Sequence, residues 1–313
     1  MLIKRKALFP ILRCPVTGQK LFKKRNEYEF KYYTKNRENM YDICNGVPLL
    51  IDDKSSIVSL QDLKSFKPLV SRKIYKGFFS FTKKLTSPSK TRTKENVNLL
   101  ISELSNIKEI PKVLIIGGGT VGQGMDYFYT SSNIDLVSFD IYNSSNINFI
   151  ADAHQIPLPR NYFDAVIIQA VLEHVLEPCE VVKEIYRVLK PRGIVYAETP
   201  FLQQVHEGGY DFTRFTESGH RYLFREFKLI KSGSTAGTGT QMLWSIDYFF
   251  RGLFRSRLIG KIAKLSFFWI RYFDHLIPEK FNIDCASGVF FLGSKSNTKL
   301  HPKEIPCCYR GSQ

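Results

Sequence analysis

Short strand-like runs alternate with helical segments over residues 111–239, and this alternation most constrains the fold. Runs rich in valine, isoleucine and leucine are separated by segments whose apolar residues recur every three or four positions. Strands that alternate with helices build a parallel sheet covered on both faces. We therefore expect an α/β fold, and its strands are predicted at 113–117, 135–140, 148–152, 164–169 and 193–198.

Differences in composition divide the rest of the chain. Turn residues punctuate the first 53 positions, and a basic, serine- and lysine-rich stretch follows and ends in a helix predicted at 95–107. A last strand is predicted within 282–296. The expected units are a small β module at 1–53, a basic linker and helix at 54–110, an α/β domain at 111–297 with a helical insert at 240–281, and a tail at 298–313.

The positive charge is concentrated at the N-terminal end. The net charge is +16, and residues 1–100 hold 22 Lys/Arg against 8 Asp/Glu, which leaves the remainder nearly neutral. A basic end suggests an anionic partner such as nucleic acid or an anionic membrane surface. The alternative is that the lysines only keep a small module soluble.

The cysteines and the apolar runs indicate a cellular location. The six cysteines are scattered and predict no disulfide framework. The first apolar run contains Pro10, ends at Arg13 and is too short for a secretory signal, and no stretch approaches the ~20 apolar residues of a membrane span. We expect a cytoplasmic protein, with a peripheral position at the inner face of a membrane as an open alternative.

Glycines follow the first predicted strand with the spacing G-x-G-x-x-G, at Gly117, Gly119 and Gly122. A Cβ there would block the tight turn and the close approach of a ligand. Asp140 ends the second strand, where a carboxylate can accept hydrogen bonds from ribose hydroxyls. The alternative for Asp140 is a loop aspartate that caps the next segment. These features fit NAD, FAD or S-adenosylmethionine equally well.

The order of motifs after the third strand separates these cofactors. Asp152-Ala153 ends that strand, Phe163-Asp164 opens the fourth, and Leu-Glu-His follows at 172–174. This order resembles the class I S-adenosylmethionine-dependent methyltransferases, in particular the ubiquinone-type and small-molecule subgroup, over about residues 111–200. The resemblance implies a Rossmann-like, mostly parallel seven-stranded sheet and S-adenosylmethionine as the cofactor.

The resemblance also implies roles for individual residues around that cofactor. It would place the three glycines under the amino-acid portion. It assigns the ribose to Asp140, the adenine ring to Ile141, the adenine amino edge to Asp152 and Ala153, and the wall near the methionine part to Gln169 and Ala170. Glu173 and His174 match the family's Leu-Glu-His, in which we favour a structural role for His174.

The segment 198–224 leaves the end of the fifth strand, where open α/β sheets bind ligands. It resembles a segment of methyltransferases that are often associated with polysaccharide or lipid pathways. His206 is the candidate general base, because histidine titrates near neutral pH. Asp211 would orient His206 or bind the acceptor, and Arg214 would pair with Asp211 or with an anionic group of the substrate. The alternative is that the three form a structural network.

Large aromatic and basic residues are interleaved over 242–277 at helical spacing. Two amphipathic helices of this kind could lie in a membrane interface. We favour the alternative, a lid packed over the substrate pocket. A lid that also touches lipid would suit a lipid-linked substrate.

The N-terminal pieces 12–15 and 45–48 resemble a zinc-ribbon-like module related to the activator subunit of tRNA and protein methyltransferases. A zinc ribbon needs four cysteine or histidine ligands, usually in C-x₂-C pairs. Position 17 is threonine and Cys44 has no close partner in the sequence. We therefore expect a small β module docked on the α/β domain without zinc, and no metal site elsewhere in the chain.

Together these features predict methyl transfer from S-adenosylmethionine to an oxygen or nitrogen of a small molecule, sugar or lipid-linked intermediate. One alternative is an RNA methyltransferase that grips RNA with its basic N-terminal region. Its stacking aromatics would be Tyr28, Phe30, Tyr32 and Tyr33. Another alternative is a non-catalytic scaffold that kept the fold.

Overall fold

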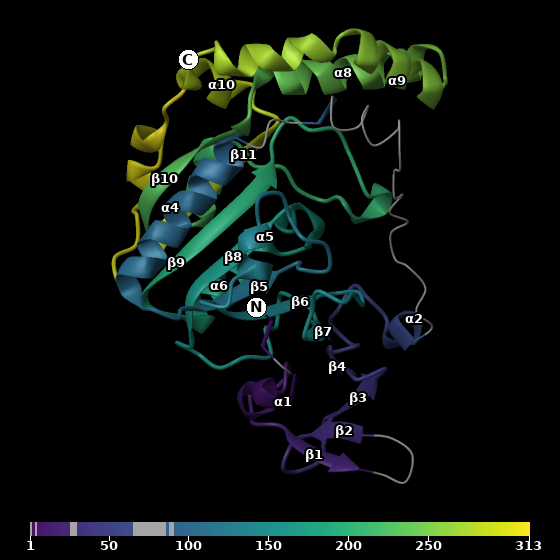
Figure 1. Cartoon of the computed structure of the whole chain (residues 1–313), viewed down its shortest axis with the longest axis vertical. Helices are drawn as coiled ribbons and strands as arrows, with labels where there is room; N and C mark the ends of the chain where they lie inside the picture. Colours follow the sequence, from purple (N-terminus) through teal and green to yellow (C-terminus); the bar gives the residue numbers. More distant parts are fainter. Residues whose placement is uncertain (1, 4, 26–29, 65–85, 88–90) are drawn as a thin grey trace.

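The computed structural model describes residues 2–3, 5–25, 30–64, 86–87 and 91–313. Its centre is a twisted sheet that contains all five predicted strands (Figure 1). They run parallel in the order β7-β6-β5-β8-β9. Strand β11 pairs antiparallel with β9, and β10 pairs antiparallel with β11, which completes a seven-stranded Rossmann-like sheet. The bounds are β5 Lys112–Ile116, β6 Asp135–Asp140, β7 Phe149–Ala151, β8 Phe163–Gln169, β9 Leu189–Pro200, β10 Phe227–Ala236 and β11 Gly288–Lys295.

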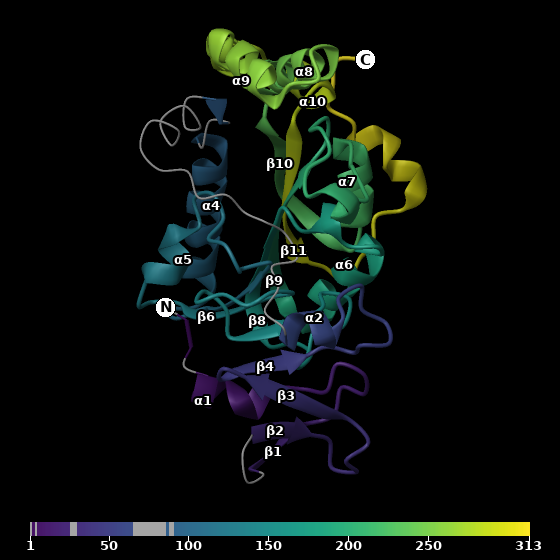
Figure 2. The same ribbon diagram turned by 90° about the vertical axis from the view of Figure 1, so that its right-hand side faces the viewer.

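Alternation along the central strands divides the core into two layers. Val113 and Ile115 of β5 face a cluster that includes Leu100 of helix α4 (Thr91–Ile107), whereas Leu114 and Ile116 face the opposite cluster. Figure 2 shows α4 and α5 (Asp126–Thr130) on one face, and α6 (Pro178–Val188) and α7 (Glu217–Leu223) on the other. Strands covered on both faces explain the nearly unbroken apolar runs in the sequence.

The N-terminal module extends this sheet. Its strands are β1 Phe22–Arg25, β2 Phe30–Tyr33, β3 Met40–Cys44 and β4 Val47–Leu50, preceded by α1 Arg5–Leu8 and a 3₁₀ turn at Phe9–Ile11. Asn45 and Gly46 both have positive φ, as a tight β3–β4 hairpin requires. Because β4 pairs parallel with β7, the sheet has 11 strands in the described part of the chain, not only the seven of the α/β domain.

The structure adds detail to three parts of this division. Helix α4 packs on the sheet and so belongs to the α/β domain, although the sequence placed it in the basic linker. The first residues of the predicted strand 282–296 end helix α10 (Glu279–Asp284), and β11 begins at Gly288. The tail at 298–313 forms 3₁₀ turns, η5 (Pro302–Glu304) and η6 (Pro306–Cys308), and Arg310 bonds Glu217 at 2.9 Å.

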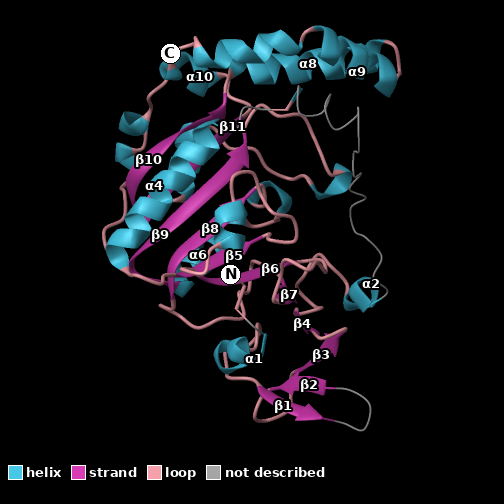
Figure 3. Ribbon diagram, in the orientation of Figure 1, coloured by secondary structure: helices cyan, strands magenta, loops and turns pink. Residues whose placement is uncertain are grey.

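The insert consists of α8 (Thr238–Leu253), α9 (Arg257–Ser266) and the 3₁₀ segment η4 (Phe268–His275). It lies beyond one end of the sheet, opposite the N-terminal module and the short helix α2 (Leu60–Lys64) that follows this module (Figure 3). Asp274 of η4 holds the start of α8, since it accepts hydrogen bonds from the Gly239 amide (2.7 Å) and the Thr240 hydroxyl (2.5 Å). None of the helices in the described ranges is long and apolar enough to cross a bilayer.

Candidate active site

The glycine loop leaves the end of β5 against Asp140. Gly117 has φ +77°, and a Cβ there would lie 2.2 Å from the side chain of Val171. The Gly119 amide donates to Asp140 Oδ2 at 2.8 Å, and the Ile141 amide donates to Oδ1 at 2.7 Å. The buried Asp140 therefore fixes the loop and still borders a cavity beside it.

That first cavity lies at the carboxyl ends of β6 and β7 and brings together four of the residues predicted to contact the cofactor's adenosine. They are Asp140, Ile141, Asp152 and Ala153. Asp152 is buried and accepts hydrogen bonds from His154 Nδ1 (2.5 Å) and from the hydroxyl of Ser56 (2.6 Å). Burial alone would raise the pKa of Asp152, but these hydrogen bonds lower it below the usual value.

The segment that follows β4 closes this cavity from the outside. Ser56 bonds Asp152, and Ile57 lines the cavity wall. Sequence reasoning assigned no site residue to this segment, because nothing in its serine-rich composition indicates a ligand. The N-terminal module is thus connected to the cavity through the residues that come directly after it.

A second cavity, of about 490 Å³, adjoins the first. Gly117, Ala170, His174 and Glu207 line both. The remaining lining residues come from α4, the glycine loop, the ends of β8, β9 and β10, the start of β11, the segment 198–224 and the insert. They include Thr93, Gly122, Gln169, Glu173, Glu198, Gln203, His206 and Trp244. Gly119 lines neither cavity and contributes its amide to Asp140.

Glu198 is a residue of this wall that sequence reasoning missed. Its carboxylate receives hydrogen bonds from Gln169 Nε2, from the Tyr196 hydroxyl and from the Thr93 hydroxyl (2.9 Å). Burial raises the pKa of Glu198. A usable signal was present, because Glu198 is an acid at the end of an otherwise apolar predicted strand.

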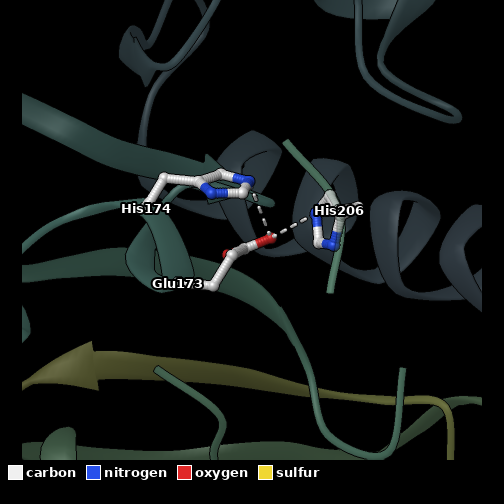
Figure 4. A group of neighbouring side chains, drawn as sticks. All are labelled: Glu173, His174 and His206. Carbon is white, nitrogen blue, oxygen red and sulfur yellow. Dashed lines mark ion pairs between the residues drawn. The ribbon is translucent and has the colours of Figure 1, made fainter. Parts of the chain in front are cut away.

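Glu173, His174 and His206 all line the larger cavity, and Figure 4 shows their side chains close together. Residues 172–174 form a 3₁₀ turn after β8, and His206 lies on the segment after β9. Glu173 Oε1 lies 3.7 Å from the Nε2 atom of each histidine, and the two imidazole rings meet edge to face at 4.9 Å. The structure thus brings His206 to the Leu-Glu-His turn, which the sequence did not indicate.

Asp211 and Arg214 hold the loop that carries His206. Asp211 Oδ2 accepts a hydrogen bond from the His206 amide at 2.7 Å and lies 3.4 Å from His206 Nδ1. Arg214 donates hydrogen bonds from two of its guanidinium nitrogens to the same carboxylate. Burial lowers the pKa of His206, but the carboxylates of Glu173 and Asp211 outweigh it and raise that pKa. Arg214 also bonds the carbonyl of Gln203, and it is not part of the cavity lining.

Residues 125–197 match a protein family whose description is "Methyltransferase domain". The ubiquinone/menaquinone biosynthesis C-methyltransferase UbiE of Neisseria meningitidis is 32% identical over 127 residues, which are 36% of this chain and 52% of that protein. The UbiE protein of Pseudomonas paraeruginosa is 32% identical over 108 residues, 29% of this chain and 42% of that protein. The chain therefore spans about half the length of these relatives.

Among solved structures, phosphoethanolamine N-methyltransferase 2 of Haemonchus contortus in complex with S-adenosyl-L-methionine aligns with a TM-score of 0.41 and 17% identity, over 64% of this chain and 53% of that one. The matched family, the UbiE relatives and the strand order agree with the motifs read from the sequence. The chain carries a class I S-adenosylmethionine-dependent methyltransferase domain.

Proposed function

We propose that the protein transfers a methyl group from S-adenosylmethionine to an oxygen or nitrogen of a small molecule, sugar or lipid-linked intermediate. The observation that carries the proposal is the junction of the two cavities. One is bordered by Asp140 and Asp152, the other by His206, and Gly117 and Ala170 line both. A cofactor that spans the junction would have its reactive end in the larger cavity.

The residues present fit this cofactor. Asp140 and Asp152 offer buried carboxylates for a ribose and an adenine edge, and a Cβ at Gly117 or Gly122 would clash with the cavity-lining side chains of Val171 and Gln169. Gln169 Oε1 is buried in the larger cavity without a hydrogen-bond partner among the described residues, so it can receive an ammonium group. Bound S-adenosylmethionine supplies an electrophilic methyl, and its transfer leaves a neutral thioether while the acceptor releases one proton.

His206 is positioned to receive that proton. Its Nδ1 faces Asp211, which leaves Nε2 directed toward Glu173 and the cavity. A raised pKa favours uptake of a proton near neutral pH. Proximity and alignment also accelerate methyl transfer, so His206 contributes one part of the rate.

The insert supports a lipid-linked acceptor. Trp244 of α8 lines the larger cavity, and the Tyr248 hydroxyl donates a hydrogen bond to the carbonyl of Val205 at 3.0 Å, which supports the interpretation of the insert as a lid over this cavity. Other positions of α8 and α9 expose Phe249 and Leu258 by 64% and 67%. A wall that has apolar side chains on both its cavity and its outer face suits an acceptor with a hydrocarbon tail.

The acceptor atom does not follow from the relatives. They are named C-methyltransferases, but the family match ends at residue 197, before the segment 198–224 that contributes to the acceptor cavity. For an RNA acceptor, Tyr32 is unsuitable because it is 6% exposed and stacks on Phe9, and Tyr28 lies outside the described residues.

Calorimetric titration with S-adenosylmethionine tests the proposal. We expect binding by the unaltered protein, a loss of affinity of tenfold or more in Asp140→Asn, and no change in Asp135→Asn. The control residue lies at the opposite end of the same strand. Absence of binding by the unaltered protein would favour the scaffold alternative, and thermal melting of both variants shows whether the fold survives.

If binding is confirmed, methyl transfer from labelled S-adenosylmethionine is assayed with pools of sugars, lipid-linked intermediates and RNA. Label in the sugar or lipid fraction supports the proposed acceptor class. Label in RNA alone would replace it with the RNA methyltransferase alternative.

A further inference from the structure

We propose that Glu173, His174 and His206 form a binding site for a divalent transition-metal ion, with Glu207 beside them as a fourth ligand. One ligand atom from each of the first three residues lies within 4.8 Å of the others. Glu207 Oε2 lies 3.8 Å from His174 Nε2. No sequence motif predicts a metal here, because the ligands come from two segments that only the fold brings together.

The carboxylate of Glu173 is the strongest indication. The residue is 1% exposed, and neither of its oxygens has a hydrogen-bond partner among the described residues. An unsatisfied buried carboxylate is costly, and buried charges in proteins are normally paired or bound to metal. The groups it faces are the Nε2 atoms of His174 and His206. A cation between them would satisfy all three side chains together.

Both imidazoles are oriented as metal ligands are. His174 Nδ1 donates to the carbonyl of Tyr210 at 2.6 Å, which assigns the proton to Nδ1 and leaves the lone pair on Nε2. His206 Nδ1 lies 3.4 Å from the Asp211 carboxylate and 3.5 Å from Gln203 Nε2, and its Nε2 also points to Glu173. A carbonyl or carboxylate behind each ligating histidine is the usual outer shell of a zinc site.

The spacing and the ligand types indicate which ion would bind. Ligands about 2.0–2.1 Å from a tetrahedral zinc ion lie roughly 3.4 Å from one another, close to the 3.7 Å between Glu173 Oε1 and each Nε2. Two imidazoles and a carboxylate are typical of zinc and other first-row ions, whereas calcium and magnesium prefer oxygen. We therefore expect Zn²⁺, or Co²⁺ in its place.

The site would act on the acceptor, an extension that rests on the proposed methyl transfer. Glu173, His174 and His206 all line the larger cavity, so an open coordination position would face the acceptor. A metal-bound hydroxyl loses its proton at a much lower pH than a free one. His206 would then serve as a ligand, and the acceptor proton would leave to solvent instead of to Nε2. This favours a hydroxyl over an amine as the acceptor.

Titration of the chelator-stripped protein with Co²⁺ tests the site without any turnover. We expect a single bound equivalent with visible ligand-field absorption, competed by Zn²⁺. Affinity is expected to fall at least tenfold in Glu173→Gln and in His206→Ala, and to fall also in Asp211→Asn, which removes the charge behind His206. His275→Ala is the matched control, since that histidine is exposed on the insert.

Because Glu173 is buried, circular dichroism must show that Glu173→Gln is folded, and the partly exposed His206 gives a second variant. Absence of stoichiometric Co²⁺ binding, or equal binding by the His206 and His275 variants, would overturn the metal site. Calorimetry with S-adenosylmethionine on the same stripped protein keeps this outcome separate from failure of the methyltransferase proposal. Turnover that survives chelation would overturn the metal's role in the reaction and leave His206 as a metal-free base.

Discussion

His220 is a buried histidine that takes no part in the candidate site. It is 1% exposed, packs against Phe215, Phe224 and Phe291, and neither ring nitrogen has a hydrogen-bond partner among the described residues. Burial lowers the pKa of His220 to about 3. The ring is therefore neutral in the folded protein, where it behaves as one more aromatic side chain.

This burial makes the protein acid-sensitive. The unfolded chain binds a proton at His220 near pH 6.5, whereas the folded chain resists it down to about pH 3. The contribution of His220 to stability is therefore fully present above the unfolded pKa and is lost as the pH drops below it, by about 2 kcal/mol between pH 7 and pH 5. Urea denaturation at the two pH values measures this loss. In His220→Phe the loss should shrink by that amount, and an unchanged loss would contradict the assignment.

A second prediction at the scale of a single residue concerns the stability lost when Gly117 is replaced. Replacement by alanine meets both the strain of positive φ and the side chain of Val171, which would lie 2.2 Å from the new Cβ. Gly18→Ala is the control, because Gly18 has φ +69° but no atom within 4 Å of the place where a Cβ would lie. We expect about 1 kcal/mol of lost stability for Gly18→Ala and clearly more for Gly117→Ala, measured by urea denaturation. Equal losses would show that the loop relaxes around the new methyl group.

At the scale of elements, the sequence predicted those strands and helices whose apolar residues form a regular pattern. All five parallel strands were found, because each is an apolar run bounded by turn residues, and α4 was found within a few residues of its start. Strand β10 was not predicted as a strand. It lies at the edge of the sheet and contains several polar residues and Gly233, so it lacks the signal of a buried strand.

The residues of the candidate site also fall into those that the sequence could predict and those that it could not. Asp140, Asp152 and the glycines could be predicted as site residues because each lies at or just after the end of a strand, and all of them except Gly119 border at least one of the two cavities. The approach of His206 to Glu173 could not, since it depends on how the segment after β9 returns across the end of β8. Contacts between loops carry no periodicity, and a single sequence leaves them undetermined.

The exposed face of the insert predicts binding to anionic membranes. Leu253, Leu258 and Ile262 are 63%, 67% and 56% exposed, and Arg255 and Arg257 lie exposed between them. Apolar side chains flanked by basic ones are complementary to an anionic lipid surface. We expect the protein to sediment with vesicles that contain anionic lipid, and much less with neutral vesicles or at high salt.

A paired substitution checks this prediction. Leu258→Glu together with Ile262→Glu should abolish sedimentation, because it places two charges on the apolar face. The matched control, Met40→Glu with Ile230→Glu, alters two exposed apolar residues elsewhere and should leave sedimentation intact. If both pairs behave alike, the insert is not the contact surface, and the basic N-terminal region becomes the better candidate.

At the scale of the whole molecule, the N-terminal module and the α/β domain share one core. Leu12 and Tyr32 belong to the same buried cluster as Phe139 and Phe149 of β6 and β7. A module held by a shared core unfolds together with its partner. The structure therefore predicts one cooperative transition for the described parts of the chain.

Leu12→Ala tests this cooperativity. The residue is 1% exposed, so its truncation should cost about 2–5 kcal/mol. Both tryptophans, Trp244 and Trp269, lie in the insert at the far end of the molecule and report on it by fluorescence, while circular dichroism reports on all strands. Both signals should move to lower urea together. A fluorescence transition that stays in place would mean that the module unfolds alone.

The hydrogen bond between Ser56 and Asp152 makes two equilibria of this protein interdependent. The Asp152 carboxylate holds the segment after β4 in place through Ser56, and it also lines the pocket in which a nucleoside would bind. Whatever factor a bound nucleoside imposes on the affinity of the module for a binding partner, that partner imposes the same factor on nucleoside affinity, because coupling free energy is reciprocal. A protein that grips strands β1 to β4 would therefore act as an effector of a pocket it never touches.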